Sequence, residues 1–347
     1  MLILGVESSC DETALALVRD GHEVMGSFIA SQMDIHAKWG GVIPEIAARE
    51  HLSALNGMYR ELMTNAGVGI EAIDAIAVTQ GPGLVGCLLV GASFAKGLAQ
   101  AARKPLIPVN HVHAHVHGAL LGLQTDAQNI FPTLALVVSG GHTNLYYMES
   151  PTHFELMAHT IDDACGESFD KVGKMMGLPY PGGPHVETLA AKGRRDKVTM
   201  PRMVERKSQL CFSYSGLKTA VAHAVRSAEE KGHSLADIAS SFQEEALGQI
   251  IRKLKIAAAM RPKSRSVIIA GGVAANGRFR ELMEESIPLK SYFPPLRYCS
   301  DNAAMIAALG YHEARRDPSL ARATDMTWDV FSRYPFERYL SADHPGT

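Results

Sequence analysis

Four histidines stand at alternate positions behind a short apolar segment, and this density of imidazole groups favours a metal or polar site. They are His111, His113, His115 and His117. Asn110 can cap a helix that starts just after the strand-like segment Leu106–Val109. The four histidines are therefore predicted to occupy the first turns of that helix.

Two pairs of these histidines could bind a metal ion, because residues four apart share one face of a helix. The pairs are His111 with His115 and His113 with His117. An apolar stripe runs between them, so local spacing does not choose a pair. Solvent-exposed or core histidines are the alternative interpretation. A metal site would also need a third ligand from elsewhere in the chain.

Length and composition limit the class of protein. A chain of 347 residues is too long for one ordinary core and predicts two domains, and its 46% hydrophobic and 20% charged residues are typical of globular proteins. A net charge of −2 means that nucleic-acid binding would need a local basic face. Five scattered cysteines without a C-x-x-C pair predict reduced thiols in a cytoplasm. We also expect no signal peptide and no membrane contact, since no apolar run approaches the roughly 18 residues of a membrane span.

The two halves of the chain repeat one order of elements. The first half is predicted to follow βββαβα, with strands at Leu2–Glu7, Ala14–Val18, Val24–Ile29 and Ile73–Thr79. The second half begins the same way, with strands at Thr133–Val138, Asn144–Met148, His153–His159 and Ser266–Ala270. The expected domains are residues 1–130 and 131–300, with a last helix and tail at 301–347 whose placement the pattern does not predict.

A polar or glycine-rich turn follows the first strand of each half, at Ser8–Thr13 and Ser139–Thr143. Such turns suit phosphate groups, because short side chains leave backbone N–H groups accessible. Gly271-Gly272 forms a third turn of this kind. The duplication predicts a two-lobed α/β fold of the actin, Hsp70 and sugar-kinase type, with a nucleotide held by these turns.

Several longer motifs accompany the histidines and extend over roughly residues 1–315. They are Glu7-Ser-Ser-Cys-Asp-Glu-Thr13, Gly81-Pro-Gly-Leu-Val-Gly86, Val138-Ser-Gly-Gly-His-Thr143, Ile161-Asp-Asp-Ala-Cys-Gly-Glu-Ser-Phe-Asp-Lys171, Tyr180-Pro-Gly-Gly-Pro184, Ser213-Tyr-Ser-Gly-Leu-Lys-Thr219, Ala270-Gly-Gly-Val-Ala-Ala-Asn276 and Ser300-Asp-Asn302. In these motifs the chain closely resembles the bacterial TsaD family of tRNA N6-adenosine threonylcarbamoyltransferases.

The resemblance implies a set of site residues. It implies His111, His115 and Asp301 as ligands of one divalent metal ion, with Fe2+ favoured and Zn2+ possible. Substrate contacts are implied at Val137, Val138, Ser139, Gly140, Gly141, Asp170, Gly183 and Asn276, and at Glu187, where some members carry a substrate-binding acid. The resemblance gives His113 and His117 no role. Without it, Asp301 would be interpreted as the N-cap of the last helix.

The activity implied by the resemblance is transfer of threonylcarbamoyl from threonylcarbamoyl-AMP to the exocyclic amine of the adenosine 3′ of the anticodon, in tRNAs that read codons starting with adenine. AMP is the leaving group, and partners of the TsaB and TsaE type are expected. Asp11 and Glu12 lie in the first polar turn and are candidates for orienting the amine or accepting its proton. An ordinary turn cap is the alternative for both.

Two other functions on the same fold remain open, an ATPase or phosphotransferase and a non-catalytic subunit of the modification complex. A zinc peptidase of the H-E-x-x-H type is not expected, because Val112 follows His111 and no acid lies between His111 and His115.

The contact with tRNA is predicted at local basic segments. The first comprises Arg194, Arg195, Lys197, Arg202, Arg206 and Lys207, and the second Arg261, Lys263 and Arg265. A solvated surface is the alternative interpretation of both.

Overall fold

The computed structural model describes residues 1–123, 129–204, 210–321 and 326–333, and the chain divides into two compact units. Unit 1 comprises Met1–His36, Val42–Ala114 and the described chain from Asn302 onward. Unit 2 comprises Ala37–Gly41 and His115–Asp301. The last helix, which the sequence pattern left unplaced, therefore belongs with the first strands of the chain.

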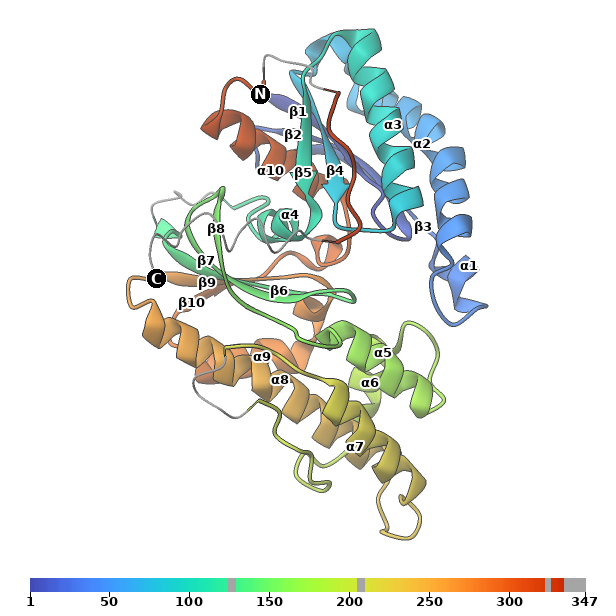
Figure 1. Cartoon of the computed structure of the whole chain (residues 1–347), viewed down its shortest axis with the longest axis vertical. Coiled ribbons are helices and arrows are strands. Elements are labelled where there is room, and N and C mark those ends of the chain that lie inside the picture. The colour runs from blue at the N-terminus through green and yellow to red at the C-terminus, as the bar shows by residue number, and fades with distance from the viewer. Residues whose placement is uncertain (124–128, 205–209, 322–325, 334–347) are drawn as a thin grey trace. The chain divides into compact units, whose positions relative to one another are not determined.

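Within the described residues, unit 1 contains one five-stranded sheet with the order β3-β2-β1-β4-β5 (Figure 1). Its strands are β1 (Leu2–Glu7), β2 (Glu12–Arg19), β3 (Glu23–Ser31), β4 (Ala75–Gly81) and β5 (Leu106–Asn110). Strands β1, β2 and β3 are antiparallel neighbours, whereas β4 and β5 run parallel to β1. The predicted three-stranded meander and the βββαβα order are confirmed.

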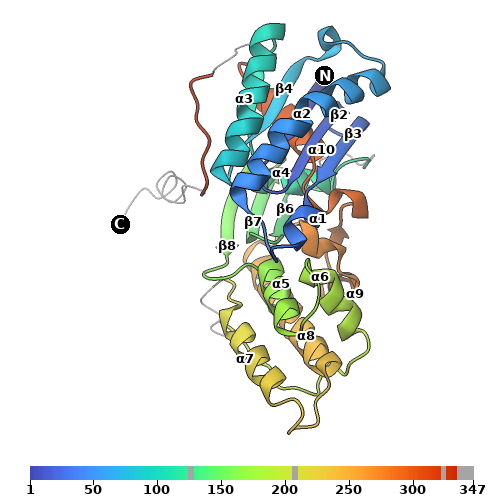
Figure 2. The same ribbon diagram turned by 90° about the vertical axis from the view of Figure 1, so that its right-hand side faces the viewer.

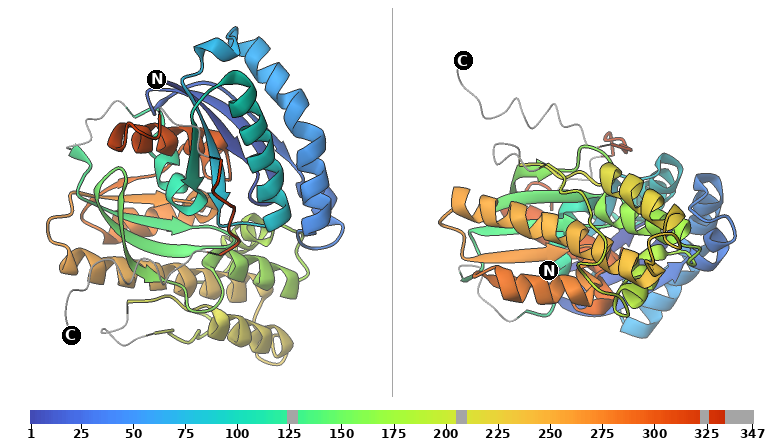
Figure 3. Two further views of the ribbon diagram at one scale, coloured as in Figure 1. Left: turned by 45° about the horizontal axis from the view of Figure 1, so that its top comes forward. Right: turned by 90° about the horizontal axis from the view of Figure 1, so that it is seen from below.

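Three long helices cover the sheet of unit 1, with α2 and α3 on one face and α10 on the other (Figure 3). The helices of this unit are α1 (Met33–Ala37), α2 (Pro44–Ala66), α3 (Val85–Ala102), the start of α4 (His111–Gly118) and α10 (Ala303–Arg316). Helix α10 approaches β1 closely, because a Cβ on Gly5 would collide with the carbonyl oxygen of Ala303. This packing holds the start of α10 against the carboxyl half of β1.

Unit 2 repeats the topology, with a sheet of the order β10-β9-β6-β7-β8 in the described chain. Its strands are β6 (Thr133–Val138), β7 (Thr143–Ser150), β8 (His153–His159), β9 (Ser266–Ala270) and β10 (Lys290–Tyr292). Again three strands form an antiparallel meander, and β9 runs parallel to β6. Strands β6 and β9 thus correspond to β1 and β4, which confirms the predicted duplication.

The helices of unit 2 build its core with the sheet. They are α5 (Cys165–Met175), α6 (Gly182–Ala190), α7 (Ser215–Arg226), α8 (Leu235–Met260) and α9 (Gly277–Ser286). Helix α8 buries one long face, and Phe242 and Ile250 pack in one cluster with residues of β6 and β9. Figure 2 shows α8 running alongside α6, with α5 and α7 nearby.

The expectation that no segment approaches the length of a membrane span needs correction. By length and composition alone, helix α3 is long and apolar enough to cross a membrane. Within unit 1 it packs on β4 and α2, and its buried face includes Cys87, Leu88 and Ala95. Its apolar character therefore has a structural explanation in the packing of this unit.

Residues 326–331, which follow α10 in the chain, also pack on unit 1. Met326 and Trp328 lie against its core, and Lys96 on α3 donates hydrogen bonds to the carbonyl oxygens of both residues at 3.1 and 2.7 Å. The backbone N–H of Phe331 then donates to the carbonyl of Gln80 at 3.2 Å. This part of the tail, whose placement the sequence pattern does not predict, is thus held to unit 1 at α3 and at the end of β4.

Candidate metal centre and nucleotide-binding turns

Helix α4 begins as the sequence predicts. The Asn110 side chain accepts a hydrogen bond from the backbone N–H of His113 at 3.1 Å, which confirms its role as a cap. All four histidines of the helix are buried, with relative exposures between 1% and 8%. The interpretation that they are solvent-exposed is therefore wrong.

Tertiary structure distinguishes the two histidine pairs. One side-chain ligand atom from each of His111, His115 and Asp301 lies within 4.8 Å of the others, and His115 Nε2 lies 3.2 Å from Asp301 Oδ1. His117 instead uses Nε2 in a 2.9 Å hydrogen bond with the carbonyl oxygen of Pro151. Burial lowers the pKa of His113 to about 3, so that this ring stays neutral at physiological pH.

The residue that caps helix α10 is Asn302, the neighbour of Asp301. Helix α10 begins at Ala303, and its N-cap is Asn302, whose side chain accepts from the backbone N–H of Met305 at 3.0 Å. Asp301 precedes the cap, and its carboxylate lies beside His115. The capping interpretation of Asp301 is therefore wrong.

Two imidazoles and one carboxylate are a donor set that suits a divalent transition-metal ion with coordination positions left for other ligands. Both histidines are buried and Asp301 is half-buried, so that the three groups can exclude much of the solvent around an ion. The donor set fits both Fe2+ and Zn2+, and its chemistry does not choose between them.

The turn that carries Asp11 and Glu12 is braced by a histidine that the sequence analysis did not single out. His51 on α2 is fully buried, and its Nδ1 lies 2.6 Å from Thr13 Oγ1 while its Nε2 lies 3.0 Å from the carbonyl oxygen of Cys10. Burial lowers the pKa of His51, which favours the neutral ring. Asp11 and Glu12 are both half-buried on this turn. The contact of His51 with this turn could be found only in the fold, because His51 lies 38 residues from Thr13 in the chain.

The predicted nucleotide-binding turns of unit 2 lie at one edge of its sheet, since β6 and β9 are parallel neighbours whose carboxyl ends lie side by side. Gly271 has a φ of +90°, and a Cβ there would lie 2.5 Å from the carbonyl oxygen of Val138. A Cβ on Gly166 would similarly lie 2.6 Å from the carbonyl oxygen of Ser139. These two glycines let the turns and α5 pack together.

Four other glycines face open space instead. A Cβ built on Gly140, Gly141, Gly183 or Gly272 would meet no protein atom within 4 Å. Their backbone is therefore accessible to a ligand, whereas Gly166 and Gly271 are required by the protein's own packing. Val137 and Val138 lie fully buried in β6, so a ligand would reach their backbone rather than their side chains.

The polar side chains that were predicted to contact substrate also hold the backbone of these turns. Asp170 Oδ1 accepts from the N–H groups of Gly182 and Gly183 at 2.8 and 3.3 Å, and burial raises the pKa of this carboxyl. Glu187 Oε1 accepts from the N–H of Gly277 at 2.7 Å.

Asn276 and Ser139 hold their turns in the same way. Asn276 Oδ1 caps α9 by accepting from Phe279 N, and its Nδ2 donates to Gln243. Ser139 Oγ accepts from the N–H of His142 at 3.2 Å. Each of these predicted substrate residues therefore also fixes the backbone or a side chain of a neighbouring turn or helix in unit 2.

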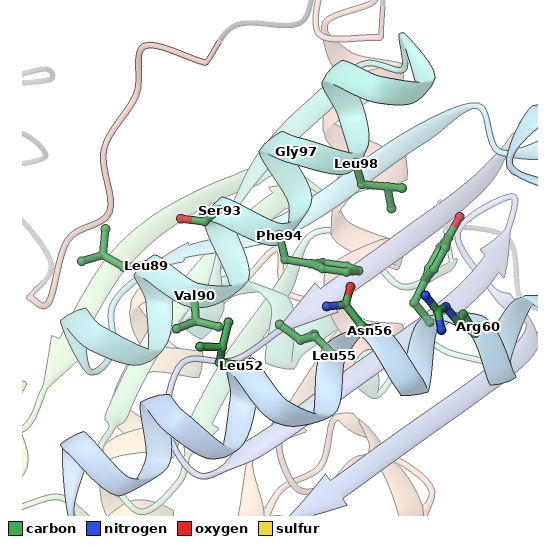
Figure 4. Close-up of a pocket in the computed structure, with 11 residues that line it drawn as sticks. Leu52, Leu55, Asn56, Arg60, Leu89, Val90, Ser93, Phe94, Gly97 and Leu98 are labelled. Carbon is green, nitrogen blue, oxygen red and sulfur yellow. The ribbon is translucent and has the colours of Figure 1, made fainter.

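An apolar groove lies elsewhere in unit 1, between α2 and α3 (Figure 4). Leu52 and Leu55 of α2 face Leu89, Val90 and Phe94 of α3 across it. None of the predicted site residues lines this groove, so it has no part in the chemistry described above.

Three arginines of the two basic segments are paired with acids. Arg194 binds both carboxylate oxygens of Asp237, at 3.2 and 3.1 Å, and Arg195 lies 3.6 Å from Glu244. Arg261 pairs with Glu155. Arg206 and Lys207 lie outside the described residues. Each pairing lowers the net positive charge that the segments offer to a polyanion.

Solved structures of low sequence identity share this fold. Component A of the (R)-2-hydroxyglutaryl-CoA dehydratase of Acidaminococcus fermentans has a TM-score of 0.54 at 16% identity, covering 91% of this chain and 99% of that one. HypF of T. kodakarensis has a TM-score of 0.58 at 14% identity, covering 93% and 49%. With the duplicated sheets, these similarities confirm the predicted α/β class of actin, Hsp70 and sugar kinases.

Sequence comparison identifies the family within that class. The profile described as "TsaD: tRNA N6-adenosine threonylcarbamoyltransferase" matches residues 23–308. A protein of that name from Chlamydia pneumoniae is 46% identical over 347 residues, covering 97% of both chains, and one from Bacillus subtilis is 44% identical over 316 residues, covering 89% and 90%. The chain belongs to the TsaD family, as its motifs predicted.

Proposed function

We propose that this enzyme transfers the threonylcarbamoyl group of threonylcarbamoyl-AMP to the exocyclic N6 amine of the adenosine 3′ of the anticodon. The acceptors are tRNAs that read codons starting with adenine, and AMP is released. The observation that carries the proposal is the grouping of His111, His115 and Asp301 in a chain of the TsaD family.

The residues divide the task between binding and chemistry. Backbone N–H groups at the open glycines, among them Gly140, Gly141 and Gly272, bind the adenylate, since no Cβ blocks their approach. His111, His115 and Asp301 hold one divalent ion, with Fe2+ favoured and Zn2+ as the alternative. When bound, such an ion supplies Lewis-acid polarisation.

Asp11 and Glu12 are the candidates for orienting the acceptor amine or accepting its proton. Their turn is held by His51 through Thr13 and Cys10, so that a rigid support lies beneath the two carboxylates. An aryl amine is a weak nucleophile, and correct orientation of such a group lowers the barrier to attack.

We also infer protein partners of the TsaB and TsaE type and action in the cytoplasm, where tRNA is modified. Five free cysteines without a disulfide among them accord with a reducing compartment.

The test supplies synthetic threonylcarbamoyl-AMP and unmodified tRNA to the metal-loaded protein with its partners and measures the modified nucleoside. We expect product with the parent chain and none with His111→Ala. Hydrolysis of ATP by the chain alone, with no modified nucleoside formed in the assay, would instead support an ATPase on the same fold. Transfer that persists unchanged in His111→Ala and in His115→Ala would show that transfer does not need this metal site, as expected of a non-catalytic subunit.

A further inference from the structure

Glu7, the last residue of β1, is fully buried at the carboxyl edge of the unit 1 sheet. Its Oε1 accepts from the backbone N–H of Ser9 at 2.5 Å, and its Oε2 accepts from Thr79 Oγ1 at 2.6 Å. His111 Nδ1 lies 3.0 Å from the same Oε2 and 3.1 Å from Ser9 Oγ. Burying a carboxylate is costly unless hydrogen bonds compensate it, so these groups form a built site for its charge.

The contacts determine which nitrogen of His111 faces away from Glu7. A carboxylate offers only acceptor atoms, so the proton of a neutral imidazole at this position lies on Nδ1 and is donated to Oε2. The lone pair is then on Nε2, the nitrogen that would bind a metal ion. Carboxylates that receive the other ring N–H are common partners of metal-bound histidines, because they fix the tautomer and increase the basicity of the ligand.

We propose that Glu7 is a positioning residue of the metal centre, which holds His111 in the Nδ1–H tautomer with Nε2 directed to the ion. The inference rests on the proposed role of His111 as a metal ligand. Neither the motif resemblance nor the family comparison assigns this function to Glu7.

The position of Glu7 depends on three strands rather than on a loop. Glu7 ends β1, Thr79 lies near the end of β4, and His111 follows directly after β5. Strands β1, β4 and β5 are adjacent and parallel, so their carboxyl ends lie at one edge of the sheet. Thr79 and Ser9 orient the carboxylate, and the carboxylate orients the imidazole, which is the kind of rigid support that a metal ligand requires.

The first test measures Co2+ affinity of the metal-free protein by competition with a chromophoric chelator. Glu7→Gln preserves size and burial, but its amide can donate to Nδ1 and so favours a proton on Nε2. We expect about 10- to 100-fold weaker Co2+ binding and an altered visible Co2+ spectrum. Glu7→Asp, which restores the charge at a shorter reach, should recover part of the affinity. Thr79→Val, which keeps the Glu7 carboxylate, should weaken binding less than Glu7→Gln.

Two outcomes separate this inference from the proposed metal site. If His111→Ala binds Co2+ as tightly as the parent chain, His111 is not a ligand and the proposed site itself is wrong. If His111→Ala loses Co2+ while Glu7→Gln retains the parent affinity, only the positioning role is overturned.

A second measurement needs no substitution at Glu7 and covers the case in which Glu7→Gln does not fold. Nitrogen NMR of the metal-free parent chain, labelled at histidine and assigned by comparison with His111→Gln, reports the tautomer of His111 at neutral pH. The Nδ1–H form supports the proposal, and an Nε2–H form overturns it.

Discussion

The carboxyl edges of the two sheets have the same topology but carry different chemistry. In unit 1 the ends of β1, β4 and β5 present polar side chains, with Glu7, Thr79 and His111 joined by hydrogen bonds. In unit 2 the ends of β6 and β9 present glycine turns, where Gly140 and Gly272 expose backbone. Duplication therefore determines where a site lies, and the residues at each edge determine whether it suits a metal ion or a phosphate group.

Histidine substitutions on α4 should have the largest effect, because they remove direct ligands. We expect His111→Ala and His115→Ala to weaken metal binding by more than about 100-fold and to abolish transfer, since removing a ligand has a larger effect than removing its support. His113→Ala and His117→Ala should keep metal and activity. For His117 we expect a stability cost of about 1–3 kcal/mol, because the carbonyl of Pro151 loses its hydrogen-bond donor.

Metal content by elemental analysis and thermal unfolding of the four variants provide the measurements. Loss of metal in His113→Ala together with retention in His111→Ala would reverse the assignment of the pair.

Gly272→Val tests whether the open glycines of unit 2 contact the adenylate. No protein atom lies near a Cβ at Gly272, so the variant should fold, keep its metal and lose affinity for a stable adenylate analogue by about 10- to 100-fold. Calorimetric titration measures this.

Two other glycines serve as controls for that experiment. Gly57→Val on α2, where a Cβ also meets open space, should leave analogue binding unchanged. Gly271→Val should instead impair folding, because a Cβ at its positive φ approaches the carbonyl of Val138. Unchanged affinity in Gly272→Val would remove this turn from the binding site.

Arg194→Glu combined with Arg195→Glu tests the basic segment of unit 2. We expect weaker tRNA binding with adenylate binding intact. The slope of the salt dependence should fall by about one unit for each phosphate group that the variant no longer neutralises. The effect should be moderate, because Arg194 is already paired with Asp237.

A matched charge reversal, Arg226→Glu with Lys231→Glu at exposed positions of α7 and the turn after it, controls for net charge. If the Arg194/Arg195 variant retains the parent's affinity and salt slope, tRNA contacts lie elsewhere, and partner subunits become the first surface to test.

The smallest expected effect concerns how the stability of unit 1 against unfolding depends on pH. Burial, with smaller contributions from the charges of His22 and Arg315, lowers the pKa of His312 on α10 to about 4. Between pH 6.5 and 4 the unfolded chain then binds more protons than the folded chain. The contribution of His312 to the free energy of unfolding is therefore largely present above about pH 6.5 and is lost as the pH falls. The expected loss between pH 7 and pH 5 is about 2 kcal/mol.

His312→Gln should reduce this pH dependence. Fluorescence of Trp328 in a Trp39→Phe background reports denaturant unfolding of unit 1, since Trp328 packs on its core. The same slope in parent and variant would show that other groups carry the effect.

The positions of the strands could be predicted from local patterns. Short apolar runs such as Leu2–Glu7 and Thr133–Val138 are typical of central strands that are buried on both faces, and both are buried along their whole length. The repeated order of these strands was sufficient to predict the duplicated fold. The motifs were sufficient to place the chain in its family.

The choice between the two histidine pairs, the cap at Asn302 rather than Asp301, and the support of His111 by Glu7 could not be read from the sequence pattern. The first and the third depend on residues far apart in the chain, since His115 meets Asp301 from another element and Glu7 and His111 are 104 positions apart. The cap is a local contact of Asn302 with Met305, and the sequence pattern did not distinguish it from a cap at the neighbouring Asp301. Local propensity describes the conformation of a segment, whereas a ligand set or a buried charge network exists only where packing brings several segments together.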